Sequence, residues 1–207
     1  KPHQRKFMTE ALPDGKQRHA QAEYIAATLE DAGYQRVGLD HYARPDDPLA
    51  VAARNGTLHR NFQGYTTDSA DTLIGLGASS IGRLPGGFVQ NTVVIREYLQ
   101  AIEAGQLATV KGYRLTAEDR LRAAVIETVM CDYAVDLDAV CRKFGADPNA
   151  LLATAGPVLD TLVTDGIAER RQHTIRVRPD ARPLVRAVAA AFDQFLGKGQ
   201  AQHARAV

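Results

Sequence analysis

Two short stretches of the chain gather side chains that could bind or transform a polar ligand. The first covers residues 38–47 and brings Asp40, His41 and Arg44 within five positions of one another. Asp40 can orient the neighbouring imidazole as a carboxylate–histidine pair, and a guanidinium can hold a carboxylate through two parallel hydrogen bonds. A capped loop, in which Arg44 pairs with one of the two aspartates that follow it, explains the same residues, so both interpretations stay open.

A second stretch, from Leu58 to Thr67, is too polar for an ordinary core strand. Its ten residues include two basic side chains, two amides, two aromatic rings and two hydroxyls. Such a mixture suits a ligand that has both an aromatic face and polar edges. Structural polar networks can have the same composition, so the residues predict a binding role and leave the ligand open.

A third stretch, from Gly75 to Gly82, combines glycines with small residues and includes Ile81. Its Gly-x-Gly spacing is not the dinucleotide-binding fingerprint. Small residues permit the close approach of a flat ligand or of a packed neighbour, and the residues alone favour packing.

The composition argues against several classes of protein. The chain has 207 residues, 45% of them hydrophobic, with 25 Lys and Arg against 24 Asp and Glu. This length is enough for one large or two small domains, and the balanced charge gives no reason to expect a nucleic acid or an anionic membrane as partner. No apolar run approaches the roughly 20 residues that span a bilayer. We therefore expect a cytoplasmic protein, and because Lys1 is not an initiator methionine we interpret the chain as part of something longer.

Cys131 and Cys141 lie ten positions apart and lack the Cys-x-x-Cys spacing of a zinc site. We expect both to be reduced thiols in the core of a cytosolic protein. A thiolate-held iron–sulfur cluster needs more cysteines than these. We therefore expect no metal ligands within this chain.

The first half of the chain is predicted to mix helices with short strands. Apolar spacing and glycine stops predict helices over residues 15–32, 48–55 and 92–104, the last capped by Asn91. Strands or extended segments are predicted over residues 34–39, 58–67 and 72–81, the last as a buried strand. Helices alternating with strands are typical of an α/β layer. We therefore expect an α/β domain over residues 1–113.

The second half is predicted to form a mainly α-helical domain over residues 114–198, followed by a disordered tail over 199–207. Helices are expected from a capping box at Thr116 onward, over 137–144, over 150–164 with a restart at Gly156-Pro157, and over 183–196. Residues 167–178 alternate like a short hairpin. Three helices with a hairpin give a winged-helix-like outline.

The winged-helix outline raises the hypothesis of DNA binding, because a basic run over residues 169–178 lies on the expected hairpin. The neighbouring helix over 150–162 lacks the Arg, Lys and Gln side chains of a recognition surface. A solvated hairpin is therefore the favoured interpretation.

The polar stretches, taken together, resemble those of the oxygen-independent coproporphyrinogen III oxidases. The resemblance is carried by Lys1-Pro2-His3-Gln4-Arg5-Lys6, Gly38-Leu39-Asp40-His41-Tyr42-Ala43-Arg44-Pro45-Asp46-Asp47, His59-Arg60-Asn61-Phe62-Gln63-Gly64-Tyr65-Thr66-Thr67 and Phe192-Asp193-Gln194-Phe195-Leu196. It covers nearly the whole chain except the tail, and it matches only the C-terminal half of the family.

The resemblance implies a fold and a reaction. Members are radical S-adenosylmethionine enzymes with a partial (β/α) barrel, whose end this α/β domain would be. A [4Fe–4S] cluster on a Cys-x3-Cys-x2-Cys loop cleaves S-adenosylmethionine, and the resulting radical leads to oxidative decarboxylation of two propionates of coproporphyrinogen III, giving protoporphyrinogen IX. This chain has no such cysteine motif. We therefore expect it to be inactive without the missing N-terminal half of the barrel.

The resemblance also implies site residues. Phe62, Gln63 and Ile81 fall at positions that line the S-adenosylmethionine region of the family, where a ring can stack, an amide can hydrogen-bond and an isoleucine can close an apolar wall. His41 and Arg44 are our own candidates on the substrate side, because a guanidinium suits a propionate. We assign no catalytic residue within the chain.

Two alternatives to the oxidase stay open. Related haem chaperones share the fold, although the Phe-Gln-Gly-Tyr sequence and the absence of Trp favour the oxidase branch. A DNA-binding regulator rests on the winged-helix outline alone, which is weak evidence for function.

Overall fold

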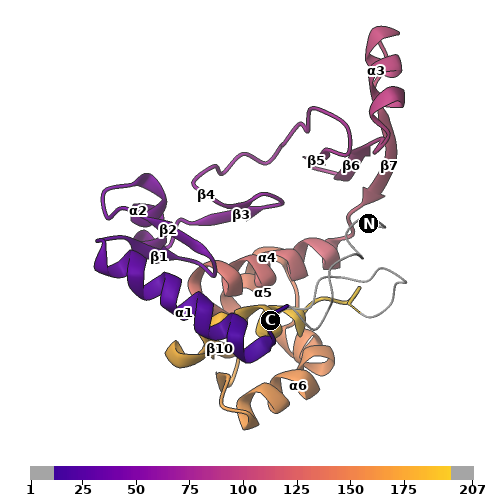
Figure 1. Cartoon of the computed structure of the whole chain (residues 1–207). Coiled ribbons are helices and arrows are strands. Elements are labelled where there is room, and N and C mark those ends of the chain that lie inside the picture. Colours follow the sequence, from indigo (N-terminus) through magenta and orange to yellow (C-terminus); the bar gives the residue numbers. More distant parts are fainter. Residues whose placement is uncertain (1–11, 197–207) are drawn as a thin grey trace.

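The computed structural model describes residues 12–196 and shows a mixture of helices and strands, as predicted (Figure 1). The first part contains α1 (Gly15–Asp31), β1 (Gln35–Val37), β2 (His41–Ala43), α2 (Pro48–Asn55), β3 (His59–Asn61), β4 (Gly64–Thr66), β5 (Ile81–Leu84), β6 (Gly87–Asn91), α3 (Ile95–Glu103) and β7 (Thr109–Arg114). The second part contains α4 (Ala117–Asp132), β8 (Ala134–Asp136), α5 (Leu137–Phe144), α6 (Pro148–Thr164), β9 (Ala168–Arg171), β10 (Thr174–Val177), a 3₁₀ helix (Pro179–Leu184) and α7 (Val185–Ala190).

The strands of residues 12–196 form small antiparallel sheets. Hairpins pair β1 with β2 and β3 with β4, while the three-stranded sheets have the orders β5-β6-β7 and β8-β10-β9. The expected hairpin near residue 170 is confirmed as β9–β10. The segment expected to be a loop after residue 40 instead begins with β2, because Val37 and His41 close a tight antiparallel turn.

Local capping explains where several helices begin and end. Thr116 and Asp119 form the predicted capping box, with the Asp119 backbone nitrogen donating to the Thr116 hydroxyl. Asp47 caps α2 at the predicted start, and Gly56 ends it in a left-handed conformation. These signals lie within a few residues of each other in the sequence, so they can be identified without tertiary information.

The expected buried strand over residues 72–81 is wrong. Ile74 and Leu76 are 76% and 84% exposed, and regular pairing begins only at Ile81 in β5. The Asn91 side-chain amide donates to the carbonyls of Gly75 and Gly77, which holds this segment as an irregular loop. Because Asn91 continues β6, it does not cap the next helix, which begins at Ile95 rather than at Thr92.

Two further helix predictions differ from the structure. Helix α6 runs continuously through Gly156 and Pro157, because the bonds lost at a proline cost less than interrupting a packed helix whose Ala155 and Leu159 are fully buried. The last predicted helix is divided between the 3₁₀ turn and α7, which ends at Ala190. Phe192 is fully buried, whereas Phe195, expected in the core, is 53% exposed.

Two apolar clusters form the core, and α4 contributes to both. The larger one joins α4, α5, α6, α7 and the β8-β10-β9 sheet. The smaller one lies beneath the β1–β2 and β3–β4 hairpins and includes Cys131 of α4.

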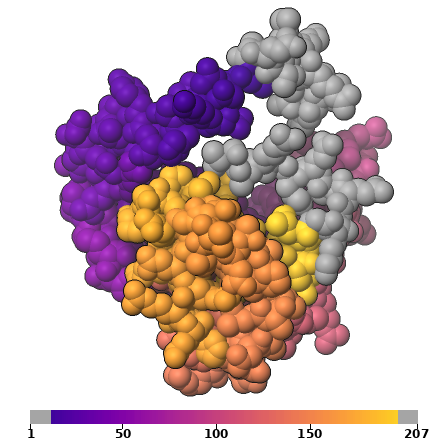
Figure 2. Space-filling view, turned by 90° about the horizontal axis from the view of Figure 1, so that it is seen from below, coloured from indigo at the N-terminus to yellow at the C-terminus, as the bar shows by residue number. Residues whose placement is uncertain are grey.

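Cys131 and Cys141 are buried free thiols, as predicted. Figure 2 shows α1 and its hairpins lying beside the helical part. The predicted boundary at residue 114 stays a prediction, as does the one at 198, and residues 199–207 lie outside the described residues.

No helix within residues 12–196 has the length and hydropathy needed to cross a bilayer.

Candidate functional site

Tyr65 joins the two polar stretches, residues 38–47 and 58–67, to helix α4; we call these stretches the first and second motif. Its hydroxyl accepts a hydrogen bond from the backbone nitrogen of Leu39 at 3.0 Å and donates to the carbonyl of Met130 at 3.0 Å. Burial raises the pKa of this phenol above its ordinary value, so the hydroxyl stays protonated and able to donate. A second tyrosine, Tyr133, donates to the carbonyl of Gly38. The first motif is therefore fastened at both Gly38 and Leu39.

The glycines of the two motifs allow them to interlock. A Cβ on Gly38 would stand 2.0 Å from the Tyr65 ring, and a Cβ on Gly64 would stand 2.8 Å from His41 Nε2. Both glycines also have positive φ angles, +59° and +140°, which other residues rarely adopt. The two motifs, separated in sequence, thus form one packed unit.

His41 lies within this unit as expected of a carboxylate–imidazole pair. Its Nδ1 lies 2.9 Å from Asp40 Oδ1, and its ring meets the Tyr65 ring edge-on with centroids 5.1 Å apart. The pairing leaves Nε2 facing the hairpin turn at Gly64. An imidazole fixed through one nitrogen can present the other to a ligand.

Phe62 and Ile81 are brought to the same sheet face through a residue that sequence reasoning missed. The rings of Phe62 and Phe88 are edge-on, with centroids 5.1 Å apart. Because Arg83 pairs with Phe88 and Ile81 pairs with Gln90 across the β5–β6 ladder, Phe88 and Ile81 point to one face. Phe62 is 55% exposed, so much of its ring is available for stacking on a ligand.

The side chains of Gln63 and Arg44 are exposed. Gln63 is exposed at the hairpin turn, where its backbone nitrogen donates to Asn61 Oδ1 at 2.8 Å. Arg44 has a 76% exposed side chain that approaches Asp46 at 3.8 Å, a weak surface pair. No hydrogen bond or ion pair within residues 12–196 joins the Arg44 side chain to Tyr65 or Phe62. The structure therefore places His41 against Tyr65 and places Phe62 against Phe88, on the sheet that bears Ile81.

The base of the β3–β4 hairpin is held by Glu127 of α4, a residue that the sequence did not single out. Glu127 of α4 accepts from the Arg60 backbone nitrogen at 3.1 Å and lies 3.2 Å from His59 Nδ1. The Arg60 guanidinium lies 5.6 Å from the centre of the Tyr65 ring. These contacts attach the hairpin to α4, so His59 and Arg60 have a structural role.

The aromatic contacts continue from the hairpin to the C-terminal segment. Phe88 pairs with Tyr113 across the β6–β7 ladder, and Tyr113 meets Phe195 edge-on at 5.8 Å. The Tyr113 hydroxyl donates to Asp119 Oδ2 at 3.2 Å. The sheet that bears Ile81 is thus attached to the start of α4 and to the segment after α7.

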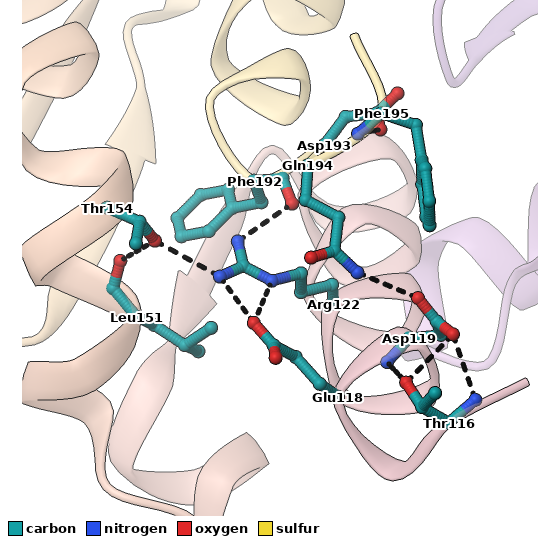
Figure 3. Close-up of polar contacts among 10 residues, drawn as sticks. All are labelled: Thr116, Glu118, Asp119, Arg122, Leu151, Thr154, Phe192, Asp193, Gln194 and Phe195. Carbon is teal, nitrogen blue, oxygen red and sulfur yellow. Dashed lines mark hydrogen bonds and ion pairs between the residues drawn. The ribbon is translucent and has the colours of Figure 1, made fainter. Parts of the chain in front are cut away.

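Figure 3 shows the polar network that holds this segment. Arg122 is only 7% exposed and donates to the Phe192 carbonyl at 3.2 Å, to the Thr154 hydroxyl at 3.1 Å and to Glu118 at 2.9 Å. Gln194 donates to Asp119 Oδ1 at 2.8 Å. Hydrogen bonds from the Thr116 backbone and side chain, and from Gln194 and Tyr113, hold the pKa of Asp119 below its ordinary value.

The thiols of this chain do not fit the role of cluster ligands. Cys131 and Cys141 are buried in two different apolar clusters of the core, whereas a [4Fe–4S] cluster needs several thiolates grouped around it. Within residues 12–196 no three His, Cys, Asp or Glu side chains are grouped as a metal site.

Comparisons with known proteins show what the chain is similar to. Residues 115–184 match the family described as the HemN C-terminal domain. The chain is 53% identical over all 207 residues to an oxygen-independent coproporphyrinogen III oxidase of Bradyrhizobium diazoefficiens, of which it covers 46%. It is 37% identical over 193 residues to that of Salmonella typhimurium, covering 93% of this chain and 42% of the relative.

A solved structure shares the fold. It is titled as coproporphyrinogen III oxidase (HemN) from Escherichia coli, a radical SAM enzyme, and matches with a TM-score of 0.86 and 34% identity over 94% of this chain and 45% of that one. The chain thus spans about half the length of the relatives that it matches. The chain is therefore similar over its full length to the C-terminal part of the oxygen-independent coproporphyrinogen III oxidases, and its residues 115–184 match the HemN C-terminal domain family.

Proposed function

We propose that this chain supplies the C-terminal part of a radical S-adenosylmethionine oxidoreductase that converts coproporphyrinogen III into protoporphyrinogen IX during haem biosynthesis in the cytoplasm. The reaction would oxidatively decarboxylate two propionates to vinyl groups. The observation that carries the proposal is the unit in which Tyr65 locks the two family motifs together beside the exposed ring of Phe62. Identity of 53% to an oxidase along the whole chain supports it.

We also propose how the sheets and helices of this chain fit into the whole enzyme. The β-hairpins and the β5-β6-β7 sheet would continue the end of a partial (β/α) barrel whose other half lies in the unmatched part of the relatives. Helices α4–α6 with the β8-β10-β9 sheet would be a winged-helix-like domain. Arg170 on that sheet pairs with Asp160 at 2.7 Å, which favours a packing role over DNA binding.

The residues on the hairpin and on β5 fit S-adenosylmethionine. The Phe62 ring would stack on the adenosyl group, the Gln63 amide would hydrogen-bond a polar edge, and Ile81 would close an apolar wall. When bound, S-adenosylmethionine with a [4Fe–4S] cluster supplies the hydrogen-abstracting chemistry. Cys131 and Cys141 are too few for the cluster and lie in separate core clusters, so its ligands would come from outside this chain.

Two residues would act on the substrate side. His41, fixed by Asp40 through Nδ1, presents Nε2 toward the hairpin turn and would donate to a propionate when protonated. Arg44 is exposed enough to reach a carboxylate without breaking a strong ion pair.

The test is a chimera in which the 207 residues of this chain replace the matched part of the Bradyrhizobium relative. We expect the anaerobically reconstituted chimera to form protoporphyrinogen IX, and the 207-residue chain alone to form none. Phe62→Ala should weaken binding of S-adenosylmethionine about tenfold by removing a stacking face, measured by titration calorimetry, while Phe144→Ala, an exposed ring on α5, should not. A folded, cluster-bearing chimera that binds haem but makes no product would refute the oxidase and favour a haem chaperone.

A further inference from the structure

Helix α3 presents an apolar stripe that residues 12–196 leave uncovered. Ile95, Leu99 and Ile102 recur at positions i, i+4 and i+7 and are 69%, 51% and 50% exposed. No residue of α3 is buried. A helix of a globular protein normally packs such a stripe against its core. We call these three residues the α3 stripe.

The segments next to the helix enlarge this surface. Further exposed apolar side chains lie just before α3, in the loop after it, on β7 and in the loop before β5: Val93, Val94, Leu107, Val110, Ile74 and Leu76. Figure 1 shows α3 at the far end of the β5-β6-β7 sheet, away from the helical part of the molecule. Single exposed apolar residues are ordinary, whereas a concentration of this kind marks a contact surface.

Polar contacts hold the surface in one shape. The Tyr98 hydroxyl accepts from the Gly77 nitrogen at 3.0 Å, which joins α3 to the loop before β5. Thr92 donates to Glu97 at 2.7 Å across the first turn of the helix. Asn91 fixes the same loop through its side-chain amide. A surface that is already ordered loses little entropy on docking a partner.

We propose that the α3 stripe docks the polypeptide that the oxidase relatives carry outside the part matched by this chain. This inference rests on the proposed function. The chain covers 46% of the Bradyrhizobium relative and 45% of the Escherichia coli structure, so each has at least as much chain again beyond the match. Parts of one enzyme that stay together permanently meet through core-like apolar contacts. A second copy of this chain is the competing occupant.

The test measures burial of the stripe in the complete protein. Leu99→Cys places a thiol on the stripe, and Gln100→Cys places one on the opposite, polar face of the same helix as a matched control. Each variant is made in the chimera and in the 207-residue chain, and alkylation rates are followed by mass spectrometry of the α3 peptide. The buried native thiols do not interfere with that peptide.

We expect alkylation of Leu99→Cys to be at least tenfold slower in the chimera than in the 207-residue chain, and alkylation of Gln100→Cys to differ by less than twofold. Equal rates for Leu99→Cys in both proteins would overturn the inference. Protection already present in the 207-residue chain and growing with its concentration would also overturn it, in favour of a second copy. Alkylation is independent of turnover, so an inactive chimera with a protected Leu99→Cys would refute the oxidase proposal and leave the docking intact.

Discussion

The ring of Tyr65 occupies the space that a side chain on Gly38 would need. An ideal Cβ at Gly38 would lie 2.0 Å from the Tyr65 Cζ atom, and the Tyr65 hydroxyl binds the backbone of the very next residue. The two residues are 27 positions apart, in the two motifs that carry the family resemblance. The two motifs therefore fit together only because residue 38 has no side chain.

Substituting Gly38 should destabilise the protein more than any glycine in an open turn. Gly38→Ala adds a left-handed backbone cost of about 1–2 kcal/mol and overpacking of about 1–3 kcal/mol against Tyr65. Gly56→Ala is the matched control, because Gly56 has a similar φ of +66° with nothing within 4 Å of its Cβ position. Urea unfolding should show a clearly larger loss for Gly38→Ala, and equal losses would contradict the interlock.

Removing the Arg122 guanidinium should loosen the C-terminal segment. Arg122→Ala deletes hydrogen bonds to the Phe192 carbonyl and to Thr154 in a buried setting, and should cost about 2–4 kcal/mol of unfolding free energy. Arg120→Ala, on the exposed side of the same helix, should cost less than about 1 kcal/mol. Amide exchange of residues 192–195 should rise only in the first variant, and unchanged protection there would count against the network.

Acid should weaken the same junction through Asp119. Its folded-state pKa is lowered, chiefly by the Thr116 backbone hydrogen bond, so its stabilisation is present above the unfolded-state pKa and is lost as the pH falls through the folded-state value. Unfolding free energy measured from pH 5 down to pH 2.5 should therefore fall less steeply for Asp119→Asn than for the wild type. Thr116→Val keeps the carboxylate but removes a donor, so the Asp119 pKa, followed by carboxyl NMR, should move up. A slope unchanged by Asp119→Asn would exclude this residue as the source.

The Cys131 thiol should be unreactive in the folded protein. Burial raises its pKa to about 12, so almost none is thiolate at pH 8. Ellman's reagent should label it only as fast as the chain unfolds, and rapidly in 6 M guanidinium. Prompt labelling of native protein at Cys131 would show that the hairpins open readily from α4.

Local signals account for what the sequence predicted well. The start of α2 at Asp47-Pro48 and the capping box at Thr116 are written in neighbouring residues, and both are found as predicted. The pairing of Asp40 with His41 is also local. Burial of the two thiols follows from residue type, because free cysteines in cytosolic proteins behave as small apolar side chains.

Long-range contacts explain the structural features that the sequence did not predict. The segment over residues 72–81 has the apolar content of a strand, but Asn91, ten or more positions later, holds it as a loop. Phe88 packs against Phe62 on the sheet face that bears Ile81, although its own sequence surroundings carry no chemical signal. Phe195 lies on Tyr113 instead of entering the core, since α7 ends early. The roles assigned to Phe62, Gln63, Ile81, His41 and Arg44 stay predictions.

Tyr65 also sets an order of events during synthesis. Its hydroxyl needs the carbonyl of Met130, which is added 65 residues later. At ribosomal rates of roughly 5–20 residues per second, the β3–β4 hairpin waits several seconds for its support. Throughout that interval the nascent chain exposes an incomplete apolar layer, so cellular chaperones have the most to protect between translation of Tyr65 and emergence of α4.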